Sequence, residues 1–266
     1  MTGAVRSELR KFFTTRMWWG MTIAVFVAGG GLAAVMGLLA GATAAASGGL
    51  PALDQSGMVN TVYTAGLSFA YLITLAVGVM AIGSEYRHKT VSSTFLATPR
   101  RVRVMLAKVT SLLGIGAFYG FVFCVSSVAV GASIIVARGF NAFPSSENVP
   151  RTLALSLLAL GLWALIGLGM GILINNQVAA LLISIGIAWI GEFIIILILN
   201  GVGWGAATKF LPGQATSAMV AQTGASGGGG PALAHLSWWA GALVLIAYAA
   251  VLAGIGSLLT IRRDVT

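Results

Sequence analysis

The string most suggestive of chemistry begins at Gly83, ends at Thr90 and reads GSEYRHKT. It differs at one position from G-x-x-x-x-G-K-[ST], a motif whose glycines let backbone amides surround the phosphates of a nucleotide. His88 stands where the motif needs its second glycine, and a long apolar stretch precedes the string where the motif requires a short strand. We therefore predict no phosphate-binding loop and no catalytic residue in this segment.

A second string begins at Gly224 and reads GASG, and His235 follows it. It resembles the G-x-S-G of rhomboid intramembrane serine proteases, in which the serine and the histidine come from different membrane spans. More glycines and Pro231 follow Ser226, so we do not expect a rigid oxyanion hole here. His235 is also too close in sequence to lie on a separate helix. A protease is therefore the weakest alternative, and we assign Ser226 to a flexible loop.

Glu192 is the acidic residue whose position is hardest to explain, because apolar residues flank it on both sides. A carboxylate at the centre of a membrane-spanning helix costs about 2.5–3.5 kcal/mol, so such a group faces protein or water. In the first of two open interpretations, Glu192 lines a translocation path, where it contacts a cationic substrate or titrates during the cycle. In the second it is a structural carboxyl, either protonated or paired with Lys209 or with a hydroxyl on another span.

The elements that position these residues are expected to lie in a membrane. Of the 266 residues, 58% are hydrophobic and 8% are charged, and the mean hydropathy is +0.97. Soluble domains average about 45–50% apolar and about 25% charged residues, so this composition excludes a soluble enzyme, a disordered chain and a disulfide-rich secreted domain. The single cysteine, Cys124, leaves no disulfide or metal framework. We predict an all-α integral membrane protein with one domain, residues 1–266.

Six apolar stretches are each long enough to cross the hydrocarbon core, which is about 30 Å thick and requires about 20 helical residues. The third stretch would form about 50 Å of helix, so we expect it to protrude from the membrane or to break. The predicted spans are residues 17–40, 59–83, 104–136, 152–174, 178–199 and 238–261.

Two features of these spans concern helix packing. A short polar segment, residues 175–177, separates the fourth span from the fifth and predicts a tight turn between antiparallel helices. Small residues let membrane helices approach closely, so the glycines of the fourth span predict close neighbours. These glycines are Gly161, Gly167, Gly169 and Gly171.

The basic residues predict the orientation of the spans. The chain carries 15 lysines and arginines against six acids, for a net charge of +9. With the N-terminus inside, most of these bases lie on the cytoplasmic side, and Arg138, Arg151 and Lys209 lie outside. We therefore predict a multi-pass protein of the cytoplasmic membrane with both termini in the cytoplasm. Nucleic acid is the usual partner of so basic a chain, but the membrane accounts for the charge better, and we expect no nucleic acid partner.

Two segments outside the spans have a distinct character. Residues 1–16 predict an amphipathic helix in the inner headgroup region, and the alternative is a merely basic flank of the first span. Residues 200–237 are apolar enough to enter lipid, but their glycines and Pro212 exclude a spanning helix. We therefore expect an outer re-entrant or interfacial element there. The apolar face of the first segment consists of Val5, Leu9, Phe12 and Phe13.

The loop between the second and third spans, residues 84–103, is the most informative segment outside the membrane. It opens with charged residues, continues with a mildly apolar stretch at residues 91–98, and returns to arginines after Pro99. Proline stops a helix at this point. We predict a helix of two to three turns on the inner face, too short to be stable alone in water and held by headgroups or by a cytoplasmic partner.

This loop resembles the signature loop of type-2 ABC export permeases. The resemblance rests on Glu85-x-x-x-x-Thr90, on the apolar run that ends at Pro99, and on the bases up to Lys108 at the start of the third span. Those permeases have six spans, cytoplasmic termini, an N-terminal amphipathic helix and an outer re-entrant element between spans five and six, so the resemblance covers essentially the whole chain. Lys89 departs from the family, which usually has glycine before this threonine, and we expect a longer helix end here.

The resemblance implies a permease subunit of an ATP-driven exporter that moves a hydrophobic or amphipathic substrate, such as a drug, an antibiotic or a lipid. Two copies of a separate ATP-binding subunit would hold ATP and magnesium, and a second permease, identical or different, would complete the transporter. This chain would hold no cofactor and would not be an enzyme itself. The loop helix would dock on the ATP-binding subunit with Phe95 as its anchor, while Glu85 fixes the loop by pairing with a nearby base. The implied contact residues are Glu85, Thr90, Val91, Ser92, Ser93, Thr94, Phe95 and Leu96.

The main alternative is a membrane protein that is not driven by an ABC subunit, such as a secondary carrier. Ion-coupled carriers usually bury several ionisable groups, and within the predicted spans we find Glu192 as the one acid. Alternatives also remain for the loop residues. Glu85 would then be a solvated charge among bases, and Phe95 would be an aromatic ring resting among the headgroups.

Overall fold

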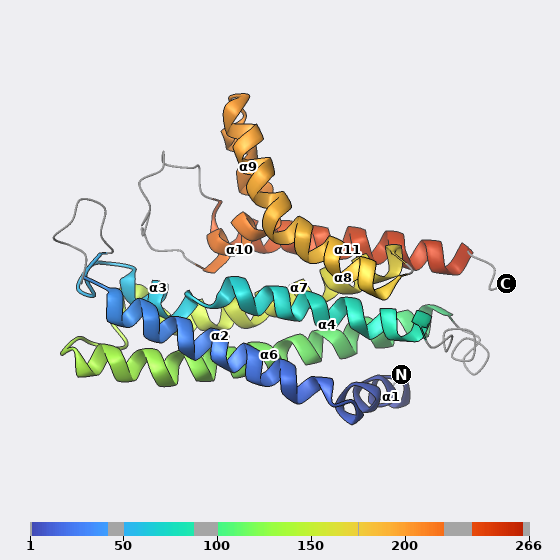
Figure 1. Ribbon diagram of the computed structural model, residues 1–266, viewed down its shortest axis with the longest axis horizontal. Coiled ribbons are helices and arrows are strands. Elements are labelled where there is room, and N and C mark those ends of the chain that lie inside the picture. The colour runs from blue at the N-terminus through green and yellow to red at the C-terminus, as the bar shows by residue number, and fades with distance from the viewer. Residues whose placement is uncertain (1, 42–50, 88–100, 175, 221–235, 263–266) are drawn as a thin grey trace.

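The computed structural model describes residues 2–41, 51–87, 101–174, 176–220 and 236–262 (Figure 1). Within these ranges the chain forms helices and no β-strand, which confirms the predicted all-helical class. In chain order the elements are α1 (Thr2–Thr14), α2 (Met17–Leu39), α3 (Met58–Thr64), α4 (Leu67–Arg87), α6 (Arg101–Ala137), the 3₁₀ turn η1 (Ser145–Glu147), α7 (Val149–Leu173), α8 (Gln177–Gly186), the π-helical turn η2 (Ile187–Gly191), α9 (Glu192–Gly201), the 3₁₀ turn η3 (Gly205–Phe210), α10 (Pro212–Val220) and α11 (Trp238–Arg262).

Six stretches of helix are long and apolar enough to cross a membrane, so the chain is a multi-pass membrane protein. Each overlaps one of the six predicted spans. The third does not break: α6 is continuous for 37 residues, about 55 Å at 1.5 Å per residue, and therefore protrudes beyond a hydrocarbon core about 30 Å thick. The six stretches are Met17–Leu39, Met58–Arg87, Val104–Ala137, Ser145–Leu173, Gln177–Gly201 and Trp238–Gly256.

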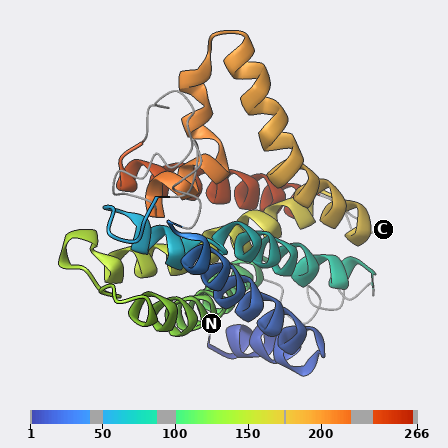
Figure 2. The same cartoon turned by 60° about the vertical axis from the view of Figure 1, so that its left-hand side comes forward.

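Helices α4 and α7 form the centre of the bundle, and α2, α6 and α11 run beside them (Figures 1 and 2). In the most apolar windows of the second and fourth spans, 61% and 67% of the residues are buried, against 17–33% in the other four spans. The outward faces of those four carry large apolar side chains such as Phe26, Phe121 and Ile190. Lipid solvates such a surface, whereas water would not. Helix α1 and the C-terminal end of α11 lie at the same end of the bundle (Figure 1).

Helix α7 lies close to its neighbours because it carries glycines, as predicted. A Cβ atom on Gly167 would collide with the carbonyl oxygen of Leu75 in α4. Gly169 and Gly171 are similarly enclosed, by α11 and by α4 respectively, whereas Gly161 has room for a methyl group. Backbones that approach this closely gain dispersion contacts that lipid cannot supply, and these contacts hold the two central helices together.

A polar contact joins the centre of the bundle to the segment after the fifth span. The rings of Tyr71 in α4 and Trp163 in α7 stack with centroids 4.2 Å apart and planes at 10°. The indole Nε1–H of Trp163 donates a hydrogen bond of 2.9 Å to Thr216 Oγ1 in α10. Because a buried indole needs an acceptor, this bond fixes α10 against α7.

The fifth span leaves the bundle and the chain then returns to it. After the π-helical turn η2, α9 projects away from the other helices, and η3 and α10 run back toward α11 (Figures 1 and 2). Gly203, with φ +81°, provides the left-handed conformation at the reversal. Pro212 is the first residue of α10, where its missing N–H costs nothing, so it begins a helix instead of breaking one. This reversal lies within residues 200–237, of which residues 221–235 are outside the described part.

The close packing of α7 makes a testable prediction. We expect Gly167→Ala to lower the free energy of unfolding by about 1–3 kcal/mol, because the added methyl group must displace backbone of α4. The measurement is unfolding of the purified protein by dodecyl sulfate in mixed micelles. Gly114→Ala in α6 is the control, because a Cβ there meets no atom within 4 Å. Equal stabilities of the two variants would contradict this account of the packing.

Candidate functional site

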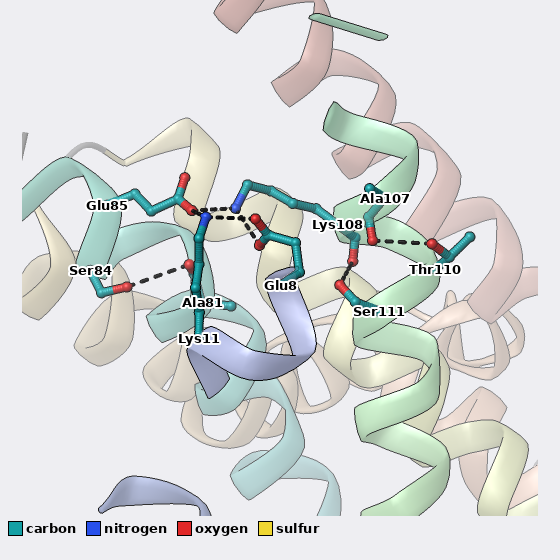
Figure 3. Close-up of polar contacts among 9 residues, drawn as sticks. All are labelled: Glu8, Lys11, Ala81, Ser84, Glu85, Ala107, Lys108, Thr110 and Ser111. Carbon is teal, nitrogen blue, oxygen red and sulfur yellow. Dashed lines mark hydrogen bonds and ion pairs between the residues drawn. The ribbon is translucent and has the colours of Figure 1, made fainter. Parts of the chain in front are cut away.

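Four charged side chains from three helices meet at the end of the bundle that carries α1 (Figure 3). Helix α1 contributes Glu8 and Lys11, which are three residues apart and so lie on one helical face. Glu85 comes from the last turns of α4, and Lys108 comes from the early turns of α6. We refer to these four residues as the inner charge cluster, where 'inner' refers to their largely buried position between α1, α4 and α6.

In the inner charge cluster each base lies between the two acids. Lys108 Nζ is 2.6 Å from Glu85 Oε1 and 2.8 Å from Glu8 Oε2. Lys11 Nζ is 3.0 Å from Glu85 Oε1 and 2.7 Å from Glu8 Oε1. The formal charges therefore sum to zero, and each ion pair is also a charge-assisted hydrogen bond.

The four members differ in their exposure to solvent. The side chains of Lys108 and Glu85 are 4% and 8% exposed, Glu8 is 14% exposed, and Lys11 is 46% exposed. A buried charge without a partner costs several kcal/mol, so Lys108 and Glu85 depend on one another and on α1. The cluster therefore fixes the N-terminal helix to the ends of two spans.

The cluster also shifts the protonation of its α1 members. Burial alone would raise the pKa of Glu8, but the charge of Lys108 and hydrogen bonds from Lys108 and Lys11 lower it below the ordinary value of 4.5. Burial alone would lower the pKa of Lys11, but hydrogen bonds and charges from Glu8 and Glu85 raise it above the ordinary value of 10.5. Both charged forms are thus favoured at neutral pH.

A cavity of about 170 Å³ is lined by the four cluster residues together with apolar side chains such as Phe12, Leu112 and Ile115. Phe12 of α1 closes one side, and its ring meets that of Tyr119 in α6 edge-on at 6.1 Å. Phe12 is buried, as expected for the apolar face of an amphipathic helix, whereas Phe13 is 41% exposed and contacts the rings of Trp18 and Phe118. Helix α1 thus packs on α6 through one part of its predicted apolar face.

The structure pairs Glu85 with two bases, as predicted, so it is not a solvated charge. The other implied contact residues of the loop, Thr90, Val91, Ser92, Ser93, Thr94, Phe95 and Leu96, lie outside the described residues, and their role stays a prediction. Ser226 and His235, the residues of the protease alternative, also lie outside the described residues. Among the residues that the structure describes, no group of three or more His, Cys, Asp or Glu side chains could hold a metal ion.

Glu192 has partners that the sequence analysis did not propose. Its Oε2 accepts a hydrogen bond of 2.9 Å from the backbone N–H of Gly213, and its Oε1 accepts one of 2.9 Å from that of Gln214. The carboxylate therefore satisfies two amides in the first turn of α10. The suggestion that Glu192 pairs with Lys209 or with a hydroxyl was wrong. The ammonium of Lys209 lies instead 5.3 Å from the centre of the Phe210 ring.

Glu147 does the same for another short helix, and this role was not predicted from the sequence. Its two carboxylate oxygens accept from the backbone N–H groups of Gly57 and Asn60 at the start of α3, at 3.0 and 2.8 Å. Arg138 has the complementary role at a helix C-terminus, where its Nη1 donates to the carbonyl oxygens of Gly37 and Ala40 at 2.7 Å each. The partners of Glu147 are 87 and 90 residues away, so no local sequence signal could have revealed them.

The exposure difference within the inner charge cluster predicts unequal effects of removing its two bases. We expect Lys108→Met to cost about 3–5 kcal/mol of unfolding free energy, because the buried carboxylate of Glu85 and the partly buried one of Glu8 both lose a partner. Lys11→Met should cost at most about 1 kcal/mol, since this lysine is half-exposed. Unfolding by dodecyl sulfate in mixed micelles measures both. A larger loss of stability in Lys11→Met than in Lys108→Met would contradict the assignment of Lys108 as the main base of the cluster.

The lowered pKa of Glu8 predicts a pH dependence of stability. A carboxyl whose pKa is lower in the folded state stabilises the fold above its unfolded-state value, and the effect is lost as pH falls through the folded-state value. The stability difference between wild type and Glu8→Gln should therefore be constant above pH 4.5 and shrink at lower pH. Thermal unfolding between pH 7 and pH 3 provides the measurement. A difference that grows on acidification would contradict the pairing.

No known protein family, no curated protein and no solved structure matches the chain.

Proposed function

We propose that this chain is the permease subunit of an ATP-driven ABC exporter. In this proposal it moves a hydrophobic or amphipathic substrate across the cytoplasmic membrane, and separate subunits hydrolyse the ATP. The observation that carries the proposal is the inner charge cluster, which joins α1 to α4 and α6, the two helices that precede and follow residues 88–100 in the sequence. That segment contains the loop helix that the family resemblance assigns to the contact with the ATP-binding subunit.

The positions of the cluster residues suit transmission of a force from that loop. Glu85 lies two residues before the end of α4 at Arg87, and Lys108 lies seven residues after the start of α6 at Arg101. Their 2.6 Å ion pair joins the helix that enters the loop to the helix that leaves it. A displacement of the loop would then move α4 and α6 together, with α1 attached through Glu8.

The remaining features of the proposal follow the sequence analysis. Helix α1 is proposed to lie in the inner headgroup region, and residues 200–237 to form an outer re-entrant element. Both termini lie in the cytoplasm, and two ATP-binding subunits with their ATP and magnesium act on this chain and on a second permease. ATP-driven closure of those subunits would push on residues 91–96 and tilt the spans. The apolar outward faces of the spans suit a cargo that moves within or through lipid.

The use of buried charge also favours this proposal over an ion-coupled carrier. Such carriers place ionisable groups along a pathway, where the groups bind and release ions. Among the described residues the buried acids form no such series: Glu85 pairs with bases, Glu147 binds backbone amides of a short helix, and Glu192 is the one acid of its span. An ATPase that acts through the cytoplasmic loop fits this placement of the buried acids better than ion coupling does.

The proposal predicts that a charge in the loop helix prevents assembly. The chain is purified through an affinity tag from membranes of its source organism, and bound proteins that contain G-x-x-x-x-G-K-[ST] are quantified by mass spectrometry. Phe95→Asp should reduce recovery of such an ATPase at least tenfold, because an apolar anchor becomes a desolvated charge. Phe143→Asp is the matched control, an exposed aromatic residue beyond the far end of α6. Equal recovery with Phe95→Asp and wild type would overturn the docking assignment.

A further inference from the structure

We propose that the cleft around Glu192 is a binding site for lipophilic organic cations that enter from the bilayer. The cleft has a volume of about 450 Å³ and lies between α4, η2, α9 and α10. Ligand pockets for small molecules typically measure about 300–1,000 Å³, so its size suits such a compound. The residues that give the cleft its chemistry are Tyr71, Trp189, Glu192, Phe193, Gln214 and Ser217.

The cleft has one charged side chain, and it is an acid. Glu192 is 7% exposed, and the other side chains that line the cleft are uncharged at neutral pH. Within the described part of the chain, no lysine, arginine or histidine lies within ion-pair distance of Glu192. Burial disfavours the charged form of this carboxyl, the amide hydrogen bonds from Gly213 and Gln214 favour it, and each oxygen can accept a further bond from a ligand. A monovalent cation would complete the charge balance.

The rest of the lining selects for an organic cation. Trp189, Phe193 and Tyr71 line the same cleft as the carboxylate, and the faces of aromatic rings attract cations. Trp189 comes from the π-helical turn η2, and its ring meets that of Phe69 in α4 edge-on at 5.9 Å. π-Helical turns are frequent at functional sites, and this one contains Trp189 and ends directly before Glu192.

The cleft is open toward the membrane. Trp189 is 55% exposed and Phe193 is 62% exposed, on the apolar face of α8, η2 and α9 that the described residues leave uncovered. An amphiphile dissolved in the bilayer can therefore reach the carboxylate without crossing water. A hydrophilic ion would have to lose its hydration in lipid before it arrived.

The cleft would bind such cations without the ATP-binding subunit. We further infer that these cations are the exported cargo, and this part rests on the proposed function. Binding to the isolated chain therefore tests the site, and recovery of the ATPase tests the exporter. Cation binding without an ATPase partner would remove the cargo assignment and retain the site.

The experiment compares two ions of nearly equal shape and opposite charge, tetraphenylphosphonium and tetraphenylborate. Equilibrium binding to the purified full-length chain in detergent is measured against protein-free micelles. We expect saturable binding of tetraphenylphosphonium and no saturable binding of tetraphenylborate. Glu192→Gln should raise the Kd for tetraphenylphosphonium at least tenfold, because it removes the counter-charge and keeps the shape.

Glu147→Gln is the matched control, because Glu147 also binds two backbone amides of a short helix but does not line this cleft. It should leave the Kd unchanged. A Kd that is equal in wild type and Glu192→Gln, or saturable binding of both ions by wild type, would overturn the proposal. If Glu192→Gln does not fold, Ser217→Trp serves instead, because it fills the cleft and leaves the carboxylate in place. Unchanged binding by that variant would also overturn the proposal.

Discussion

Lipid offers no hydrogen bonds, so a charge or a backbone amide that lies in it must find a partner within the protein or cost several kcal/mol. The placement of the buried acids in this chain follows from that constraint. Glu8 and Glu85 form ion pairs with Lys11 and Lys108 at one end of the bundle. The carboxylates of Glu147 and Glu192 satisfy amides at the starts of other helices, described above.

These ion pairs and hydrogen bonds explain how short helices stay folded beside the long spans. Helices α3 and α10 have seven and nine residues, and helices of that length are marginal on their own. The first backbone N–H groups of each donate hydrogen bonds to a carboxylate from another element. Helix α1 is likewise fixed by side-chain pairs to α4 and α6. The long spans, in contrast, pack through glycines and stacked rings such as Tyr71 and Trp163.

The six spans could be predicted from sequence because hydropathy over about 20 residues is a local property. The glycines of α7 were also informative, since small residues have few other uses in a membrane helix. A base beside Glu85 could be predicted, but the part that α1 plays in the cluster could not, because Lys108 and Glu8 are 100 residues apart and their contact depends on how α1 docks. That Glu192 must face protein or water could be predicted from its apolar neighbours. Its partners could not, because they depend on a chain reversal at Gly203 that returns α10 to it.

In the proposed transporter, the inner charge cluster makes α1, α4 and α6 move as one body when the ATP-binding subunit acts on the loop between α4 and α6. Distances between spin labels, measured by pulsed electron paramagnetic resonance, test it most directly. Cysteines replace the exposed residues Arg87, Thr110 and Trp204 in pairs, with Cys124→Ser, in the complex with the proposed ATP-binding subunit. On trapping with ATP, the distance from 87 to 110 should stay constant while that from 87 to 204 changes. A changed distance from 87 to 110, or two unchanged distances, would contradict the account.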